Sequence, residues 1–152
     1  MRNRPVSRFR LPRITSRSPP NSHKICRQAP HGGVSVLRPD AHVRVADADY
    51  EDAFFVEIDR ATESLTTIRS KCQAYAAYWR SGTEQVSAGV FPKVVWIVPS
   101  EHRADGIRRT ITRLGQTEQQ LFTVTTEADA LTALLPSDDP PPTTSMKGGA
   151  TS

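Results

Sequence analysis

The chain has 152 residues, 37% of them hydrophobic, with 12 prolines, a net charge of +4 and a mean hydropathy of -0.47. This length suits one domain with its own core, and the polar composition predicts that part of the chain stays outside that core. The sequence has neither an apolar run long enough for a membrane span nor a secretory signal, and Cys26 and Cys72 match no disulfide or metal spacing. It therefore predicts a cytoplasmic protein with reduced thiols.

The charge is unevenly distributed along the chain. Residues 1–33 carry eight Arg and Lys and no acid, whereas residues 34–152 carry twelve basic and sixteen acidic residues. The basic leader, residues 1–33, is predicted to be disordered. It is either an arm that follows DNA phosphates or an extension without a function. Residues 136–152, rich in Pro, Thr and Gly, are predicted to form a second disordered tail.

Residues 34–135 show the alternating pattern of an α/β domain. The first two strands are predicted at residues 34–37 and 41–45, and an acidic turn at 46–52 leads to a third strand at 53–59. Apolar residues run almost without interruption through this third strand, which indicates that it is covered on both faces.

A helix is predicted after the third strand, capped by Thr62 or Ser64 and ended by Gly82. Its apolar positions are spaced three and four residues apart, as one buried stripe requires, and are Leu65, Ile68, Cys72, Tyr75 and Trp79. The remaining elements are a strand at 93–98, a helix at 101–114, a strand at 120–125 and a helix at 127–135. We expect the later strands to be parallel, because helices connect them.

Three carboxylates fall near the ends of the second and third strands. Side chains alternate along a strand, so Glu57 and Asp59 project from the same face of the third strand. If the strand at 41–45 pairs antiparallel with it, Asp40 comes level with them. An oxygen-rich group of this kind suits a hard cation, so the pattern predicts a Mg²⁺ site of Asp40, Glu57 and Asp59.

Lys71 lies two turns into the following helix, at the edge of its apolar stripe. From there it is predicted to lean over the strand ends and stabilise charge on an attacked phosphate, while a bound metal ion activates water. The alternative is structural: Asp40 is an ordinary turn residue, and Glu57 and Asp59 form ion pairs with Arg60 and Arg44.

Two other groups allow a nucleic-acid role as well as a structural one. The aromatic residues of the first helix either stack on bases or pack in and around the core, and they are Tyr75, Tyr78 and Trp79. The arginines of the second helix either bind phosphates or form a solvated face, and they are Arg103, Arg108, Arg109 and Arg113. The sequence contains no glycine-rich phosphate loop and no nucleophile elbow, so it gives no support for nucleotide hydrolysis or serine chemistry.

Several linked motifs occur in a fixed order and together resemble the replication-relaxation family of bacterial plasmid and mobile-element proteins. The resemblance covers roughly residues 35–135. The motifs are Arg38-Pro39-Asp40-Ala41, Phe54-Phe55-Val56-Glu57-Ile58-Asp59-Arg60, Thr62-Glu63-Ser64, Lys71, Tyr75, Tyr78-Trp79, and Phe91-Pro92 through Trp96-Ile97-Val98-Pro99.

This resemblance implies a domain similar to the PD-(D/E)XK restriction-endonuclease-like fold, with a mixed sheet flanked by helices. In that family the domain follows a winged-helix DNA-binding region, so the chain resembles the C-terminal half of such a protein. Asp40 would be the motif aspartate and Glu57 the second acidic ligand. Asp59 stands where that superfamily usually has lysine, and Lys71 would supply the lysine from the helix.

The implied role is replication, relaxation or transfer of plasmid or mobile-element DNA, with Mg²⁺-dependent DNA nicking. Glu57 and Lys71 would be the catalytic residues, and the partners would be DNA and plasmid replication or transfer proteins. The alternative is a non-catalytic DNA-binding or protein-interaction module, or a truncated remnant, with the same fold.

Overall fold

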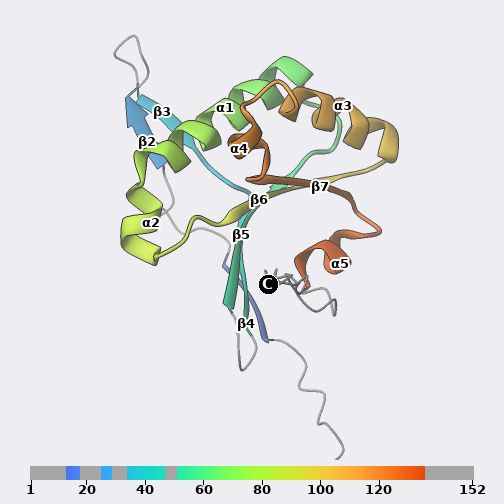
Figure 1. The fold of residues 1–152 in the computed structure, drawn as a ribbon. Coiled ribbons are helices and arrows are strands. Elements are labelled where there is room, and N and C mark those ends of the chain that lie inside the picture. Colours follow the sequence, from blue (N-terminus) through green and yellow to red (C-terminus); the bar gives the residue numbers. More distant parts are fainter. Residues whose placement is uncertain (1–12, 18–24, 29–33, 47–50, 136–152) are drawn as a thin grey trace, which may run out of the picture.

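The computed structural model describes residues 13–17, 25–28, 34–46 and 51–135, and Figure 1 shows how their elements are arranged. They form the α/β fold that the sequence predicts, a mixed sheet flanked by helices. In this part of the chain, no helix is long and apolar enough to cross a membrane.

Five strands make up the main sheet, in the order β1-β4-β5-β6-β7. Their bounds are Arg13–Arg17 (β1), Ala41–Ala46 (β4), Glu51–Ile58 (β5), Lys93–Val98 (β6) and Phe122–Thr126 (β7). The β1–β4 and β4–β5 pairs are antiparallel, whereas the β5–β6 and β6–β7 pairs are parallel, as predicted for strands that helices connect. A separate antiparallel ribbon joins β2 (Ile25–Gln28) to β3 (Val34–Leu37).

The helices are α1 (Leu65–Ser81), α2 (Thr83–Ala88), α3 (Glu101–Ile111), α4 (Gln116–Gln119) and α5 (Ala130–Leu134). Ser64 rather than Thr62 caps α1, because Ser64 Oγ accepts the backbone N–H of Thr67 at 3.1 Å. Gly82 ends α1 with φ 69°, a left-handed conformation that glycine adopts without steric cost. The sequence does not predict α2 and α4, because helices of 6 and 4 residues are too short to show an apolar stripe.

Two strands, β1 and β2, lie within residues 1–33, the segment that the sequence predicts to be a disordered leader. β1 pairs with β4 in a register that sets Arg13 opposite Ala46. Strand pairing uses backbone groups, and the side chain of Ile14 stays 47% exposed, so no apolar alternation reveals this edge strand. The other residues of 1–33, and the tail predicted at 136–152, lie outside the described residues.

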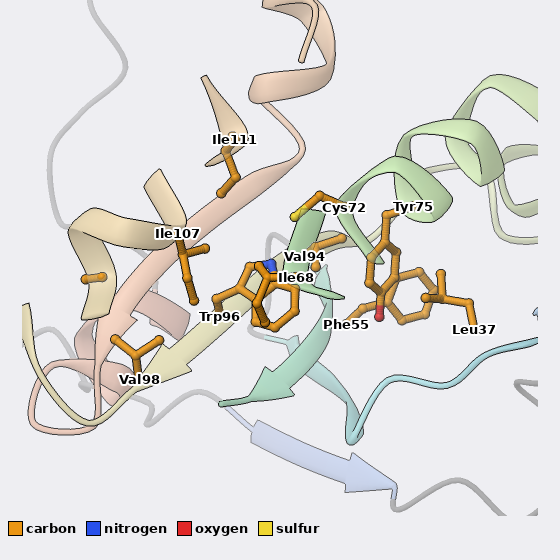
Figure 2. Packing of buried hydrophobic residues seen from close by; sticks show 11 residues of the cluster. Leu37, Phe55, Ile68, Cys72, Tyr75, Val94, Trp96, Val98, Ile107 and Ile111 are labelled. Atoms are coloured by element: carbon orange, nitrogen blue, oxygen red, sulfur yellow. The ribbon is translucent and has the colours of Figure 1, made fainter. Parts of the chain in front are cut away.

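The main sheet has a core on each of its faces. On one face, Phe55 of β5 packs with Tyr75 of α1 and Trp96 of β6 beneath α1 and α3 (Figure 2). On the other face, Phe54 and Val56 of β5 belong to a second cluster, against which the end of α5 packs. β5 is therefore covered on both faces, as its apolar run predicts.

Candidate functional site

The carboxylate of Glu57 lies in the protein interior near the carboxyl end of β5. Because side chains alternate along a strand, Glu57 points to the same face as Phe55, under α1. Glu57 is only 1% exposed. Tyr75 Oη donates to its Oε1 at 2.6 Å and Lys71 Nζ donates to its Oε2 at 3.2 Å, so both carboxylate oxygens have a partner.

Helix α1 supplies both donors. Lys71 and Tyr75 are four residues apart and therefore lie on one face of the helix, one turn from each other. Tyr75 is fully buried, with its ring centroid 5.9 Å from that of Phe55. Lys71 lies at the rim, with a side chain 30% exposed and its Nζ 5.7 Å from the ring centroid of Trp96. The ammonium group thus leans over the end of β5.

A second carboxylate shares the same lysine. Lys71 Nζ donates to Glu63 Oε1 at 3.0 Å, and Glu63 lies on the segment that joins β5 to α1. The side chain of Glu63 is 36% exposed, whereas that of Glu57 is 1% exposed. The ammonium group therefore sits between a buried acid and a half-exposed one.

Burial and charge shift the pKa values of this group. Burial raises the pKa of Glu57, and the hydrogen bond from Tyr75 and the nearby charge of Lys71 offset this effect only in part. For Lys71, partial burial lowers the pKa, but the hydrogen bonds and charges of Glu63 and Glu57 outweigh it and raise the pKa overall. The environment therefore favours the charged form of Lys71, whereas it disfavours the charged form of Glu57.

Asp40 lies just before β4 and contacts the end of β5. The antiparallel pairing of the two strands sets Ala41 opposite Val56, which brings the exposed Asp40 level with the residues that follow. Its Oδ2 accepts the backbone N–H of Ile58 at 2.7 Å. The charge of Asp40 adds to burial in raising the pKa of Glu57, so the two carboxylates are close enough to repel each other.

Asp59 has a different partner, on α3. Arg103 Nε donates to its Oδ2 at 2.5 Å and Arg103 Nη2 to its Oδ1 at 3.1 Å, a bidentate pair in which Asp59 is 4% exposed. The backbone N–H of Ala61 also donates to Oδ1, at 3.2 Å. Both oxygens of Asp59 are thus held by protein donors.

The three predicted metal ligands therefore do not form one group. In the described part of the chain, no cluster of three or more His, Cys, Asp or Glu side chains is arranged to hold a metal ion. Asp59 does not fit a metal site, since Arg103 occupies its carboxylate. Asp40 and Glu57 remain the candidate ligands, because Asp40 is exposed and Glu57 is held by the partly exposed Lys71 rather than by a bidentate arginine, and Mg²⁺ in proteins is often held by one or two carboxylates together with substrate phosphates.

The structural ion pairs also differ from those that the sequence suggests. The buried acids pair with Lys71 and Arg103. Arg44, the expected partner of one of them, instead pairs with Glu51 at 2.9 Å on the surface.

Sequence reasoning missed the roles of Glu63 and Arg103. The sequence analysis groups Arg103 with arginines that face solvent or bind phosphates, but Arg103 lies four residues before the buried Ile107 and so continues the inward stripe of α3. That spacing was a usable signal. The segment that carries Glu63 has no periodic pattern, so the sequence gives no means of predicting the contact between Glu63 and Lys71.

The other candidate groups have mainly structural contacts. Tyr78 Oη donates to Glu84, and its ring lies 5.5 Å from that of Phe91. Arg108 pairs with two acids of its own helix, Glu101 at 2.9 Å and Asp105 at 3.0 Å. Tyr75 and Tyr78 thus pack, as one of the two interpretations predicts, and Arg108 lies on a solvated helix face.

Comparison with known proteins identifies a family. The model of a family described as replication-relaxation matches residues 6–94, more than half of the chain. The matched range begins and ends earlier than the expected 35–135, and it contains Asp40, Glu57 and Lys71 but stops before Arg103. No curated protein and no solved structure matches the chain.

Proposed function

The chain belongs to the replication-relaxation family, its role is therefore related to replication, and from this premise we propose that it nicks DNA in a Mg²⁺-dependent reaction. The proposed site consists of Asp40, Glu57 and Lys71. Its substrate would be plasmid or mobile-element DNA, with plasmid replication or transfer proteins as further partners. The likeness to PD-(D/E)XK nucleases is part of this proposal.

One observation carries the proposal: Lys71 Nζ lies 3.2 Å from Glu57 at the strand end that Asp40 also contacts. Two acids can hold a metal ion and a lysine can stabilise negative charge on an attacked phosphate, so together these groups suit metal-assisted phosphodiester cleavage. The three residues come from three different elements, and the pairing of β4 with β5 and the phase of α1 bring them together.

Each side chain has a separate task. Asp40 and Glu57 would hold the Mg²⁺ ion, which when bound polarises the phosphate and lowers the pKa of a coordinated water. Tyr75 donates to Glu57 and keeps its carboxylate oriented in the dry interior. Lys71 presents a positive charge at the rim, where it stabilises the negative charge that develops on the attacked phosphate.

A second candidate is a non-catalytic DNA-binding or protein-interaction module. It is favoured by the complete pairing of Glu57, whose two oxygens already have donors in Tyr75 and Lys71. A carboxylate satisfied in this way stabilises the fold without a metal ion.

The proposal is tested by the nicking of supercoiled plasmid with Mg²⁺ or Mn²⁺. Lys71→Met is expected to lower the nicking rate by about a hundredfold, the usual effect of removing one group that stabilises transition-state charge. Glu57→Gln should lower it at least as much, because it removes a charged ligand of the metal ion. Glu84→Gln is the matched control, because Glu84 is also a carboxylate that accepts from a tyrosine of α1, and it should nick as the wild type does.

Equal nicking by all four proteins, or none by any of them, would contradict nicking at this site. In that case, a gel-shift assay would measure DNA binding. Binding that neither Mg²⁺ nor Lys71→Met changes would support the non-catalytic module.

A further inference from the structure

The charged side chains at the site continue into a chain of contacts that reaches α3. It runs from Glu57 to Lys71, then to Glu63, and through Arg103 to Asp59. We propose that Glu63 is a positioning residue for Lys71, and that Arg103 in turn fixes Glu63. This inference rests on the proposed function, since it assigns what aligns the lysine of that site.

Lys71 has two anchors of different character. Glu57 holds it from the interior at 3.2 Å, and Glu63 holds it from the half-exposed side at 3.0 Å. A lysine side chain is a point charge on a flexible four-carbon stem, so a single acceptor leaves it free to swing. Two acceptors restrict the position of the ammonium nitrogen more than one does.

Glu63 would also hold Lys71 if Glu57 bound a cation instead of the lysine. A cation at Asp40 and Glu57 would compete with Lys71 for Glu57. Glu63 is not part of that pair, so it remains an acceptor for Lys71 during the competition. Glu63 would therefore keep the lysine at the rim if a cation replaced Lys71 as the partner of Glu57.

Arg103 fixes the segment on which Glu63 lies. Its Nη2 donates to the backbone carbonyl of Glu63 at 2.6 Å and to Asp59 Oδ1 at 3.1 Å, so a single guanidinium group holds both ends of the segment. Between these ends, Ala61 has φ 59°, a left-handed conformation that is unfavourable for alanine. The segment keeps this conformation because Asp59 accepts the N–H of Ala61 and Arg103 clamps the ends.

The clamp requires arginine. The planar guanidinium group donates through Nε and Nη2 to three acceptors at once, whereas the single nitrogen of a lysine cannot reproduce this fork. α3 packs beside α1 above the sheet, so the clamp ties the segment to the same helix layer that carries Lys71 (Figure 1). Arg103→Lys should keep the charge while releasing Glu63.

The test follows the side-chain ammonium protons of Lys71 by ¹⁵N NMR at one fixed pH. Glu63→Ala is expected to speed their exchange with water by about tenfold, because it removes one of two hydrogen-bonded anchors. Arg103→Lys should act in the same direction. If Arg103 acts through Glu63, the double variant should exchange no faster than Glu63→Ala alone. Glu51→Ala, which breaks the surface pair with Arg44, is the control and should leave Lys71 unchanged.

Unchanged exchange in a folded Glu63→Ala protein would overturn the inference, as would a full effect of Arg103→Lys in the Glu63→Ala background. Glu63 is half-exposed, so its variant is expected to fold even if Arg103→Lys does not. The NMR result needs no nicking. An inactive wild-type protein therefore counts against the proposed function alone.

Discussion

Glu57 and Asp59 are two residues apart, both nearly fully buried, and yet they are held in different ways. Asp59 forms a bidentate ion pair with Arg103, whose side chain is 16% exposed. Glu57 relies on Tyr75 and on Lys71, which is 30% exposed and shared with a second acid. The comparison teaches that burial alone does not identify a functional carboxylate. The acid whose cation can change partners is the better candidate.

The largest effect should come from removing the cation of Asp59. Arg103→Met leaves a buried carboxylate without its partner and is expected to lower the free energy of unfolding by about 3 kcal/mol. Lys71→Met should cost only about 1 kcal/mol, because Lys71 is 30% exposed and Tyr75 still donates to Glu57. Urea unfolding at neutral pH measures both values.

The matched control for this prediction is Asp59→Leu combined with Arg103→Met. Replacing both charges of a buried pair with apolar groups is often close to neutral, so the double variant should recover part of the lost stability, while the Ala61 N–H and the Glu63 carbonyl still lose their partners. Equal costs for Arg103→Met and Lys71→Met would show that the two acids are held alike, against the comparison.

A smaller effect, the pH dependence of stability linked to Cys72, should report how well water is excluded from the core around Glu57. Burial raises the pKa of the Cys72 thiol, which neighbours Lys71 on α1, to about 12 from its usual 9.0. The unfolded chain releases this proton above pH 9 while the folded chain keeps it, so the stability linked to Cys72 is present below pH 9 and is lost as the pH rises from 9 to 12.

Relative to Cys72→Ala, the wild-type protein should therefore lose about 1 kcal/mol of stability between pH 9 and pH 10. Urea unfolding of both proteins at these two pH values measures the difference. A constant difference would mean that water reaches the thiol, and that Glu57 is less isolated than its burial indicates.

Local patterns in the sequence predict one half of this comparison and miss the other. Alternation along β5 places Glu57 and Asp59 on one face, and the periodicity of α1 places Lys71 at its rim, because both patterns depend on near neighbours. The pairing of Asp59 with Arg103 joins residues 44 positions apart. No local pattern encodes that contact.

The same limit applies to the edge of the sheet. β1 is joined to β4 by backbone pairing over a long sequence separation, and the composition of this segment predicts disorder. Asp40 is placed correctly because an antiparallel neighbour is the simplest partner for the strand that follows it. The grouping of Asp59 with Asp40 and Glu57 as metal ligands went further than strand alternation supports.

Binding of Mn²⁺ tests most directly the central claim that the functional acid is Glu57 with Asp40, while Asp59 is structural. Isothermal titration calorimetry would compare the wild type, Asp40→Asn, and the Asp59→Leu and Arg103→Met double variant. We predict that Asp40→Asn weakens Mn²⁺ binding by about tenfold or more, since it removes one of two charged ligands, whereas the double variant binds like the wild type. A folded double variant that no longer binds Mn²⁺, an Asp40→Asn protein that binds it unchanged, or a wild type that does not bind it would contradict the account.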